Sequence, residues 1–186
     1  MKIHSLEKWE RCELAAELIR RRLRTFHVKD LLKLPETEIR EIHRMVHGSS
    51  PSPGGRRSSL YCCRTRLDQQ RLSLLVLLYR EVGGPTSLLK PIDSRTLINS
   101  FDLFQDICST PGLDLTDAWL LLSDHLKGDI ALTHCKKCGI EYLQFPNAEI
   151  PISCPFCELK NRRLSRLSSG EIETNKEADP DVLYKR

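Results

Sequence analysis

The stretch Cys135-Lys136-Lys137-Cys138, echoed 15 residues later by Cys154-Pro155-Phe156-Cys157, decides how the last third of this chain folds. Two thiolates three positions apart can bind one metal ion from a tight turn, and two such turns complete a tetrahedron of sulfurs. This donor set suits zinc and leaves no coordination position open for catalysis. We therefore predict one structural zinc ion in a zinc-ribbon-like unit, with four ligands: Cys135, Cys138, Cys154 and Cys157.

Other interpretations of these cysteines are weaker. Four unrelated buried cysteines would not be expected to repeat the same spacing. A thioredoxin-type redox pair needs a βαβ context, and the helical pattern before Cys135 does not provide one. His134 could replace Cys135 as a ligand, although Cys135 restores the symmetric spacing. The other four cysteines lack ligand spacing and are predicted to be small apolar core residues: Cys12, Cys62, Cys63 and Cys108.

Upstream of the cysteines, the sequence is patterned for helices. Apolar side chains recur at three- and four-residue spacings over residues 10–24, 28–32, 36–47, 64–81, 94–108 and 115–127. The Ser-Pro-Ser-Pro-Gly-Gly run within residues 49–59 predicts a loop. Downstream, alternating residues at 130–134 and 140–145 predict two short strands. The expected fold is mainly α: a helical domain followed by a small four-cysteine zinc-ribbon-like unit.

These patterns predict three parts in the chain of 186 residues. Residues 1–128 form the helical domain, and residues 129–166 form the zinc-binding unit with its basic flank. Residues 167–186 have few apolar side chains, so a disordered tail is predicted there.

No transmembrane or secretory segment is expected. The longest apolar run, residues 74–79, is far short of the roughly 20 residues that a bilayer requires. Residues 1–11 lack the apolar region of a signal peptide. A cytoplasmic protein without a membrane partner is therefore predicted, and its cysteines are expected to be thiols or metal ligands rather than disulfides.

The net charge of +4 is too small to indicate a nucleic-acid partner, so the placement of the charge matters more. Three basic clusters could each neutralise phosphates. A solvated face is the better explanation for any one of them alone, and the two interpretations are about even for the third, which adjoins the cysteine pairs. The first is Arg20, Arg21, Arg22 and Arg24; the second is Arg56, Arg57, Arg64 and Arg66; the third is Lys160, Arg162, Arg163 and Arg166, next to Lys136 and Lys137.

Residues 28–47 have the outline of a helix-turn-helix. The outward face of its second helix is predicted to show Thr37, Arg40, His43, Arg44 and His47. Arg40 and Arg44 could then reach phosphates or guanine edges. An ordinary helical hairpin with a solvated charged face is the alternative, and it is slightly favoured because Glu38 and Glu41 oppose phosphate binding.

The two histidines of this helix, His43 and His47, also have metal-ligand spacing. A zincin motif would require Glu between them at position 44, where this chain has Arg44. We therefore predict surface histidines. The sequence contains no phosphate loop, nucleophile elbow or dinucleotide fingerprint, so we do not expect an enzyme.

Several of these stretches together resemble the FlhC family, the C subunit of the bacterial flagellar master regulator. The resemblance covers roughly residues 10–165. It is carried by Glu13-Leu14-Ala15-Ala16-Glu17-Leu18-Ile19, by Met45-Val46-His47-Gly48-Ser49-Ser50-Pro51-Ser52-Pro53-Gly54, and by the two CxxC pairs with the basic stretch after them. It implies a mostly helical fold with zinc at the four cysteines. It also implies a hetero-oligomer with an FlhD-type subunit, binding to promoter DNA upstream of flagellar operons, and recruitment of RNA polymerase.

The expected function is thus that of a DNA-binding transcriptional activator subunit. A zinc-stapled protein–protein adaptor without DNA contact is one alternative. A divergent regulator without flagellar targets is another, because the family tends to carry aromatic residues, including Trp, after the Pro-Gly turn. Here residues 56–63 contain Tyr61 as their one aromatic residue.

Overall fold

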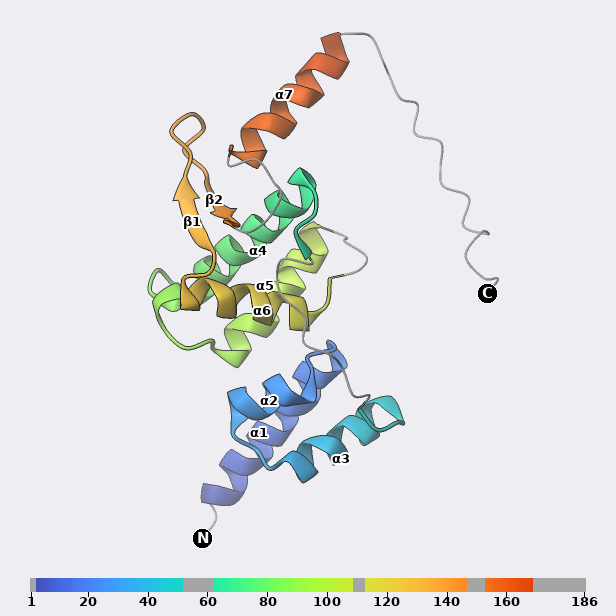
Figure 1. Cartoon of the computed structure of the whole chain (residues 1–186). Helices are drawn as coiled ribbons and strands as arrows, with labels where there is room; N and C mark the ends of the chain where they lie inside the picture. Colours follow the sequence, from blue (N-terminus) through green and yellow to red (C-terminus); the bar gives the residue numbers. More distant parts are fainter. Residues whose placement is uncertain (1–2, 52–61, 109–112, 147–152, 169–186) are drawn as a thin grey trace, which may run out of the picture.

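The computed structural model describes residues 3–51, 62–108, 113–146 and 153–168, with residues 3–5 and 162–168 described by backbone alone. In Figure 1 the N-terminal helices lie at one end, the middle helices follow, and a β-hairpin with the last helix lies at the other end. The prediction of a mainly helical fold followed by a small cysteine-bearing unit is confirmed. The elements are α1 (Ile3–Arg20), α2 (Thr25–Leu32), α3 (Glu36–His47), α4 (Arg66–Gly83), the 3₁₀ helix η2 (Ser87–Leu89), α5 (Ser94–Ile107), α6 (Leu115–Lys127), β1 (Ala131–His134), β2 (Glu141–Gln144) and α7 (Pro155–Ser168).

Helices α2 and α3 pack against the apolar face of α1. Leu18 of α1, Val28 of α2 and Ile39 of α3 are fully buried. Lys33 ends α2 in the left-handed conformation with φ 54°, and its N–H caps the helix by donating to the Lys29 carbonyl. The short helix, turn and longer helix predicted at residues 28–47 are therefore present.

The turn after α1 connects this group to the middle helices. α1 ends at Arg20, and Arg22 adopts a left-handed φ of 66°. The Thr116 hydroxyl in α6 donates to the Arg22 carbonyl (2.7 Å) and accepts from the Arg24 N–H (3.1 Å). The prediction of one helix over 10–24 was wrong at its end, because contacts with α6 satisfy these backbone groups in a turn.

The middle helices begin at strong capping residues. Thr65 and Asp68 form a reciprocal capping box at α4, and Asp114 and Asp117 form another at α6. Such caps satisfy N–H groups that the first turn leaves without helical partners. Behind them lies a continuous apolar core that includes fully buried side chains from all three helices: Val76, Leu97, Phe104, Leu115 and Leu121.

The two predicted strands form an antiparallel hairpin that packs on α4. Leu132 pairs with Leu143 across the hairpin. The Leu143 N–H donates to the Ser73 hydroxyl (2.9 Å), and the Leu143 carbonyl accepts from the Gln69 amide (2.7 Å). Ile130, Leu143 and Phe145 belong to the same core as the helices. The division of the chain at residue 128 remains a prediction.

Helix α7 was not predicted. Pro155 occupies its first position and Glu158 lies in its first turn, both of which favour a helix start. The helix ends at Ser168, inside the predicted tail, and residues 169–186 lie outside the described residues. Of the predicted loop at 49–59, the structure describes residues 49–51.

The cysteines without ligand spacing lie where the sequence predicted them. Cys63 is buried, and Cys12, Cys62 and Cys108 are half-buried against the core. Burial raises the pKa of the Cys63 thiol to about 12. Within the described ranges, no helix has both the length and the apolar character needed to cross a bilayer.

Candidate metal centre

A tight turn between the strands presents the first cysteine pair. The Cys135 N–H donates to the Ile140 carbonyl (3.0 Å), and the Gly139 N–H donates to the Cys135 carbonyl (2.9 Å). Gly139 has a φ of 75°, a conformation that residues with a side chain rarely adopt. The backbone therefore folds back sharply directly after Cys138.

The second pair lies at the start of α7. Cys154 immediately precedes the helix, and Cys157 lies in its first turn. The Cys154 carbonyl accepts the Glu158 N–H at 3.2 Å. One pair is thus positioned by a hairpin turn and the other by a helix start.

The four sulfurs come together although the pairs are far apart in sequence. All four lie within 4.8 Å of one another. The Cys135 and Cys157 sulfurs are 3.8 Å apart, and those of Cys138 and Cys154 are 3.7 Å apart. A tetrahedron with Zn–S bonds of about 2.3 Å has edges of about 3.8 Å. The cluster is therefore the right size to bind one metal ion.

The pKa shifts of these thiols are consistent with a cation at this position. Backbone N–H groups of Cys138 and Lys137 lower the pKa of Cys135 to about 6. Contact with Cys138 raises the pKa of Cys157 to about 12, and burial raises the pKa of Cys154. Thiolates this close together repel one another, so several of them would require a positive charge among the sulfurs. A divalent ion would supply it, because metal ligation deprotonates coordinating thiols.

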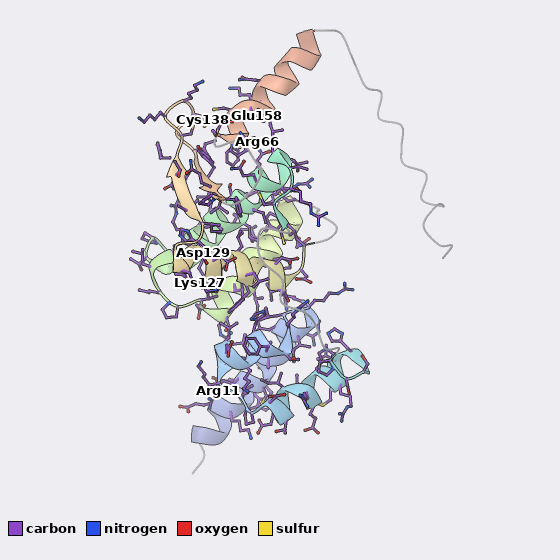
Figure 2. All side chains as sticks on the ribbon, in the orientation of Figure 1. Arg11, Arg66, Lys127, Asp129, Cys138 and Glu158 are labelled. Atoms are coloured by element: carbon purple, nitrogen blue, oxygen red, sulfur yellow. The ribbon has the colours of Figure 1, made fainter. Side chains whose placement is uncertain are left out.

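The four-cysteine cluster is surrounded by a small apolar group. Cys135, Cys154 and Tyr142 are buried together, with Phe156 half-buried against them. Cys138 is exposed. Figure 2 shows Cys138 at the end of the molecule that also carries Arg66 and Glu158.

Arg66 was assigned to a phosphate-binding cluster, and the structure contradicts this. Its side chain is 7% exposed and binds Glu158 at 2.7 Å. Arg56 and Arg57 of the same cluster lie outside the described residues. The pattern of charges gave no sign that Arg66 is buried, since its partner lies 92 positions away.

The other candidate DNA-binding residues do not form one surface. Lys136 and Lys137 are exposed in the turn between β1 and β2, and Lys160 is exposed on α7. Arg162, Arg163 and Arg166 follow on the same helix, with side chains outside the described part. Figure 1 places α1–α3 at the opposite end of the molecule.

The arginines after α1 have varied environments. Arg20 pairs with Glu17 at 2.5 Å. Arg21 donates to both carboxylate oxygens of Asp102, each at 2.8 Å. Arg22 is exposed, and Arg24 is half-buried at the start of α2. These residues include the connection between the two helical groups, so they do not all lie on one helix, as a helix over 10–24 would require.

Helix α3 has the predicted shape, with His47 exposed and His43 half-buried. His47 Nε2 lies 3.0 Å from the Ile19 carbonyl, and His43 Nδ1 lies 2.9 Å from the Ser49 carbonyl. Arg40 pairs with Glu36 at 2.5 Å. Arg44 is exposed. The outward face of α3 therefore carries arginines beside acidic residues, and His47 lies at the surface as predicted, whereas His43 is half-buried.

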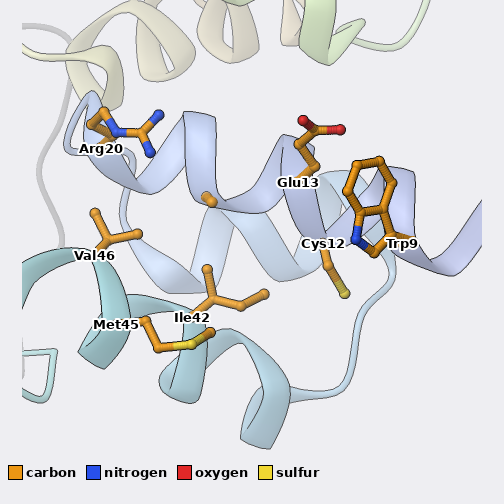
Figure 3. A pocket seen from close by; sticks show the side chains of 8 residues that line it. Trp9, Cys12, Glu13, Arg20, Ile42, Met45 and Val46 are labelled. Carbon is orange, nitrogen blue, oxygen red and sulfur yellow. The ribbon is translucent and has the colours of Figure 1, made fainter.

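An apolar groove between α1 and α3 had no counterpart in the sequence predictions. It has a volume of about 490 Å³. Trp9 and Met45, which line it, are 62% and 72% exposed, and the apolar side chains of Ile42 and Val46 also line it. Figure 3 shows Trp9 and Cys12 on α1, and Ile42, Met45 and Val46 on α3. The signal in the sequence is Trp9 itself, a large apolar residue among charged neighbours.

The chain was also compared with known proteins. No protein-family model matches it. It is similar to the flagellar transcriptional regulator FlhC of Thauera aminoaromatica, with 25% identity over 164 residues. The match covers 84% of this chain and 82% of that protein.

Proposed function

We propose that this chain is a DNA-binding transcriptional activator subunit that acts with an FlhD-type partner at flagellar operons in the cytoplasm. The similarity to a flagellar transcriptional regulator over 84% of the chain carries this proposal. The four-cysteine cluster supports it, because a centre with four sulfur donors has a structural rather than a catalytic role.

In this proposal the metal is zinc, bound by Cys135, Cys138, Cys154 and Cys157. Its role is to fix the hairpin turn against α7. Zinc supplies folding free energy here, since structural sites of this kind bind the ion as the segment folds.

The DNA contact is proposed at the metal end of the molecule. Lys136 and Lys137 are exposed on the hairpin turn, and Lys160 is exposed on α7. Arg162, Arg163 and Arg166 continue the basic sequence along that helix. A backbone contact of this kind contributes affinity rather than sequence choice.

The partner contact is proposed at the groove between α1 and α3. Exposed Trp9 and Met45 line it beside other apolar side chains, and Glu13 and Arg20 also line the groove. This combination suits the apolar face of a partner helix with charged flanks. RNA polymerase would then be recruited by the assembled complex.

The test uses the chain co-expressed with the FlhD-type subunit of its own genome. Binding of the purified complex to flagellar promoter DNA and to random DNA is measured over a salt series. We expect preference for the promoter and a steep loss of affinity with salt, because each phosphate contact releases counterions.

A variant pair locates the contact. Lys136→Ala with Lys137→Ala should weaken binding to both DNAs alike and reduce the salt slope by about two. Lys90→Ala, an exposed lysine between η2 and α5, is the matched control. Equal DNA binding by the two variants would show that the turn with Lys136 and Lys137 does not contact DNA.

A protein–protein adaptor is the second candidate, and the apolar groove favours it. The adaptor predicts a stable complex without DNA affinity, and function that survives loss of the basic residues. A divergent regulator predicts salt-sensitive DNA binding without preference for flagellar promoters.

A further inference from the structure

Arg66 is an unusual residue for the first position of a helix. The capping box of Thr65 and Asp68 fixes the start of α4 and thereby the place of Arg66. A cation at a helix N-terminus is opposed by the helix dipole. The side chain is also 7% exposed, and a buried charge is costly unless it is paired and hydrogen-bonded. Strong contacts must therefore offset both costs.

Those contacts lie at the two ends of the second cysteine pair. Arg66 Nη2 donates to the Ser153 carbonyl (2.6 Å) and to the Ser153 hydroxyl (2.5 Å). Arg66 Nε donates to Glu158 Oε2 at 2.7 Å. Ser153 directly precedes Cys154, and Glu158 directly follows Cys157. One planar guanidinium thus hydrogen-bonds to the chain on both sides of the second cysteine pair.

The same guanidinium is connected to the hairpin that carries the first pair. Arg66 Nη1 donates to Gln69 Oε1 at 2.6 Å, and Gln69 Nε2 donates to the Leu143 carbonyl at 2.7 Å. Ser73 accepts the Leu143 N–H at 2.9 Å. Further along α4, Arg80 pairs with Glu141 at 2.5 Å. Helix α4 therefore holds both halves of the candidate metal centre.

We propose that Arg66 is a positioning residue for the metal centre, which places Cys154 and Cys157 for zinc before the ion binds. The second pair is 15 residues from the first, so an untethered pair would lose much conformational freedom on binding. Because Arg66 binds both ends of the second pair, part of this conformational freedom is already lost when the helical body folds. It also brings a fixed positive charge to a cluster that becomes negative when four thiolates bind one divalent ion. The inference depends on the metal centre and is independent of DNA binding.

The test measures zinc affinity of the full-length chain by competition with a chromophoric chelator. Arg66→Met keeps the aliphatic stem and removes all five donors. Arg71→Met is the control, because it removes the same charge from the same helix and Arg71 makes no hydrogen bond or ion pair with the described residues. We expect Arg66→Met to weaken zinc binding by about 10- to 100-fold, the usual effect of removing an outer-shell partner. Arg71→Met should bind as the unaltered chain does.

A second measurement separates positioning from simple destabilisation. The free energy of unfolding is measured for Arg66→Met and for the unaltered chain, each with saturating zinc and with excess chelator. Positioning predicts a larger loss of stability in zinc than in chelator. Equal losses, or equal zinc affinity of Arg66→Met and Arg71→Met, would overturn the proposal.

If Arg66→Met does not fold, Arg66→Lys provides the test. Lysine retains the charge but lacks the planar fork needed to reach Ser153, Glu158 and Gln69 together. We expect an intermediate loss of zinc affinity and an unchanged thiolate-to-metal absorption band with Co²⁺. Full zinc affinity in Arg66→Lys would show that the simultaneous contacts of the guanidinium are not needed. Absence of zinc binding by the unaltered chain would overturn the metal centre itself.

Discussion

The helical body, α1 to α6, and the metal-bearing segment, residues 131–158, are held together by different forces. In the body, side chains such as Val76, Leu97 and Phe104 are completely buried in one continuous core. Around the four-cysteine cluster, the separate apolar group has three buried members: Cys135, Tyr142 and Cys154. Burial of apolar area therefore stabilises the body, whereas it contributes little around the sulfurs.

This difference shows that the two regions respond to different changes. The body depends on packing, and we expect it to fold without metal. In our proposal, the segment of residues 131–158 depends instead on the bound ion and on polar contacts with α4. Leu143 is the point where the two mechanisms meet, because it is buried in the helical core and lies on the strand that follows the hairpin turn.

Removal of the metal should have the largest effect and should separate the regions most clearly. A chelator, or Cys154→Ser with Cys157→Ser, removes binding free energy on the order of 10 kcal/mol from the metal-bearing segment. We expect loss of amide hydrogen-exchange protection at residues 135–142 and 154–158, with protection retained in α5 and α6. Cys12→Ser is the control, since Cys12 lies on α1 outside the cluster. Unfolding of the whole chain by the chelator would show that the two regions are not separable.

A cavity in the body should have the converse effect. Phe104→Ala removes a side chain with no exposure and should cost about 3–5 kcal/mol of unfolding free energy, measured by urea denaturation of the zinc-loaded chain. Leu103→Ala is the matched control, because Leu103 is 40% exposed and should change stability by about 0.5 kcal/mol or less. Zinc stoichiometry should stay the same in both variants. A Phe104→Ala protein that no longer binds zinc would show that the metal site depends on packing in the helical body.

A smaller effect is expected within the body, at the connection between its two helical groups. Arg21 forms a two-point ion pair with Asp102, and the two side chains are 24% and 47% exposed. Solvent screening limits such a pair, so Arg21→Met should cost about 1 kcal/mol in urea denaturation. A double-mutant cycle with Asp102→Asn tests the pairing. Additive losses would indicate that the pair does not couple the groups.

The smallest effect is a pH dependence at a second connection between these groups. His27 of α2 stacks on Trp119 of α6 with ring centroids 3.9 Å apart. Burial lowers the pKa of His27 below its ordinary 6.5. The unfolded chain therefore takes up this proton first, so the stability contribution is complete above pH 6.5 and decreases as the pH falls below it.

The measurement compares stability curves between about pH 5 and 8 for the unaltered chain and His27→Gln. The difference between the curves isolates His27, because acid weakening of the zinc–thiolate bonds is common to both proteins. We expect the advantage of the unaltered chain to shrink toward low pH. A constant difference would show that His27 does not titrate on unfolding.

Local sequence was sufficient for elements with clear start and stop residues. Helix α6 was predicted at residues 115–127 and found there, because Asp114 caps its start and Gly128 its end. The hairpin followed from alternation, and the cluster of four sulfurs followed from the spacing of the cysteines. In each case the decisive residues lie within a few positions of one another or repeat one pattern.

Tertiary structure decided what the charged residues do. In the sequence, Arg21, Arg66 and Lys136 are all members of basic clusters. In the structure, Arg21 binds Asp102, Arg66 is buried beside the second cysteine pair, and Lys136 is exposed. The groove at Trp9 likewise exists because α3 packs beside α1. Helical and metal-binding patterns are local and therefore readable in the sequence, whereas the partner of a charged side chain is chosen by contacts between distant segments.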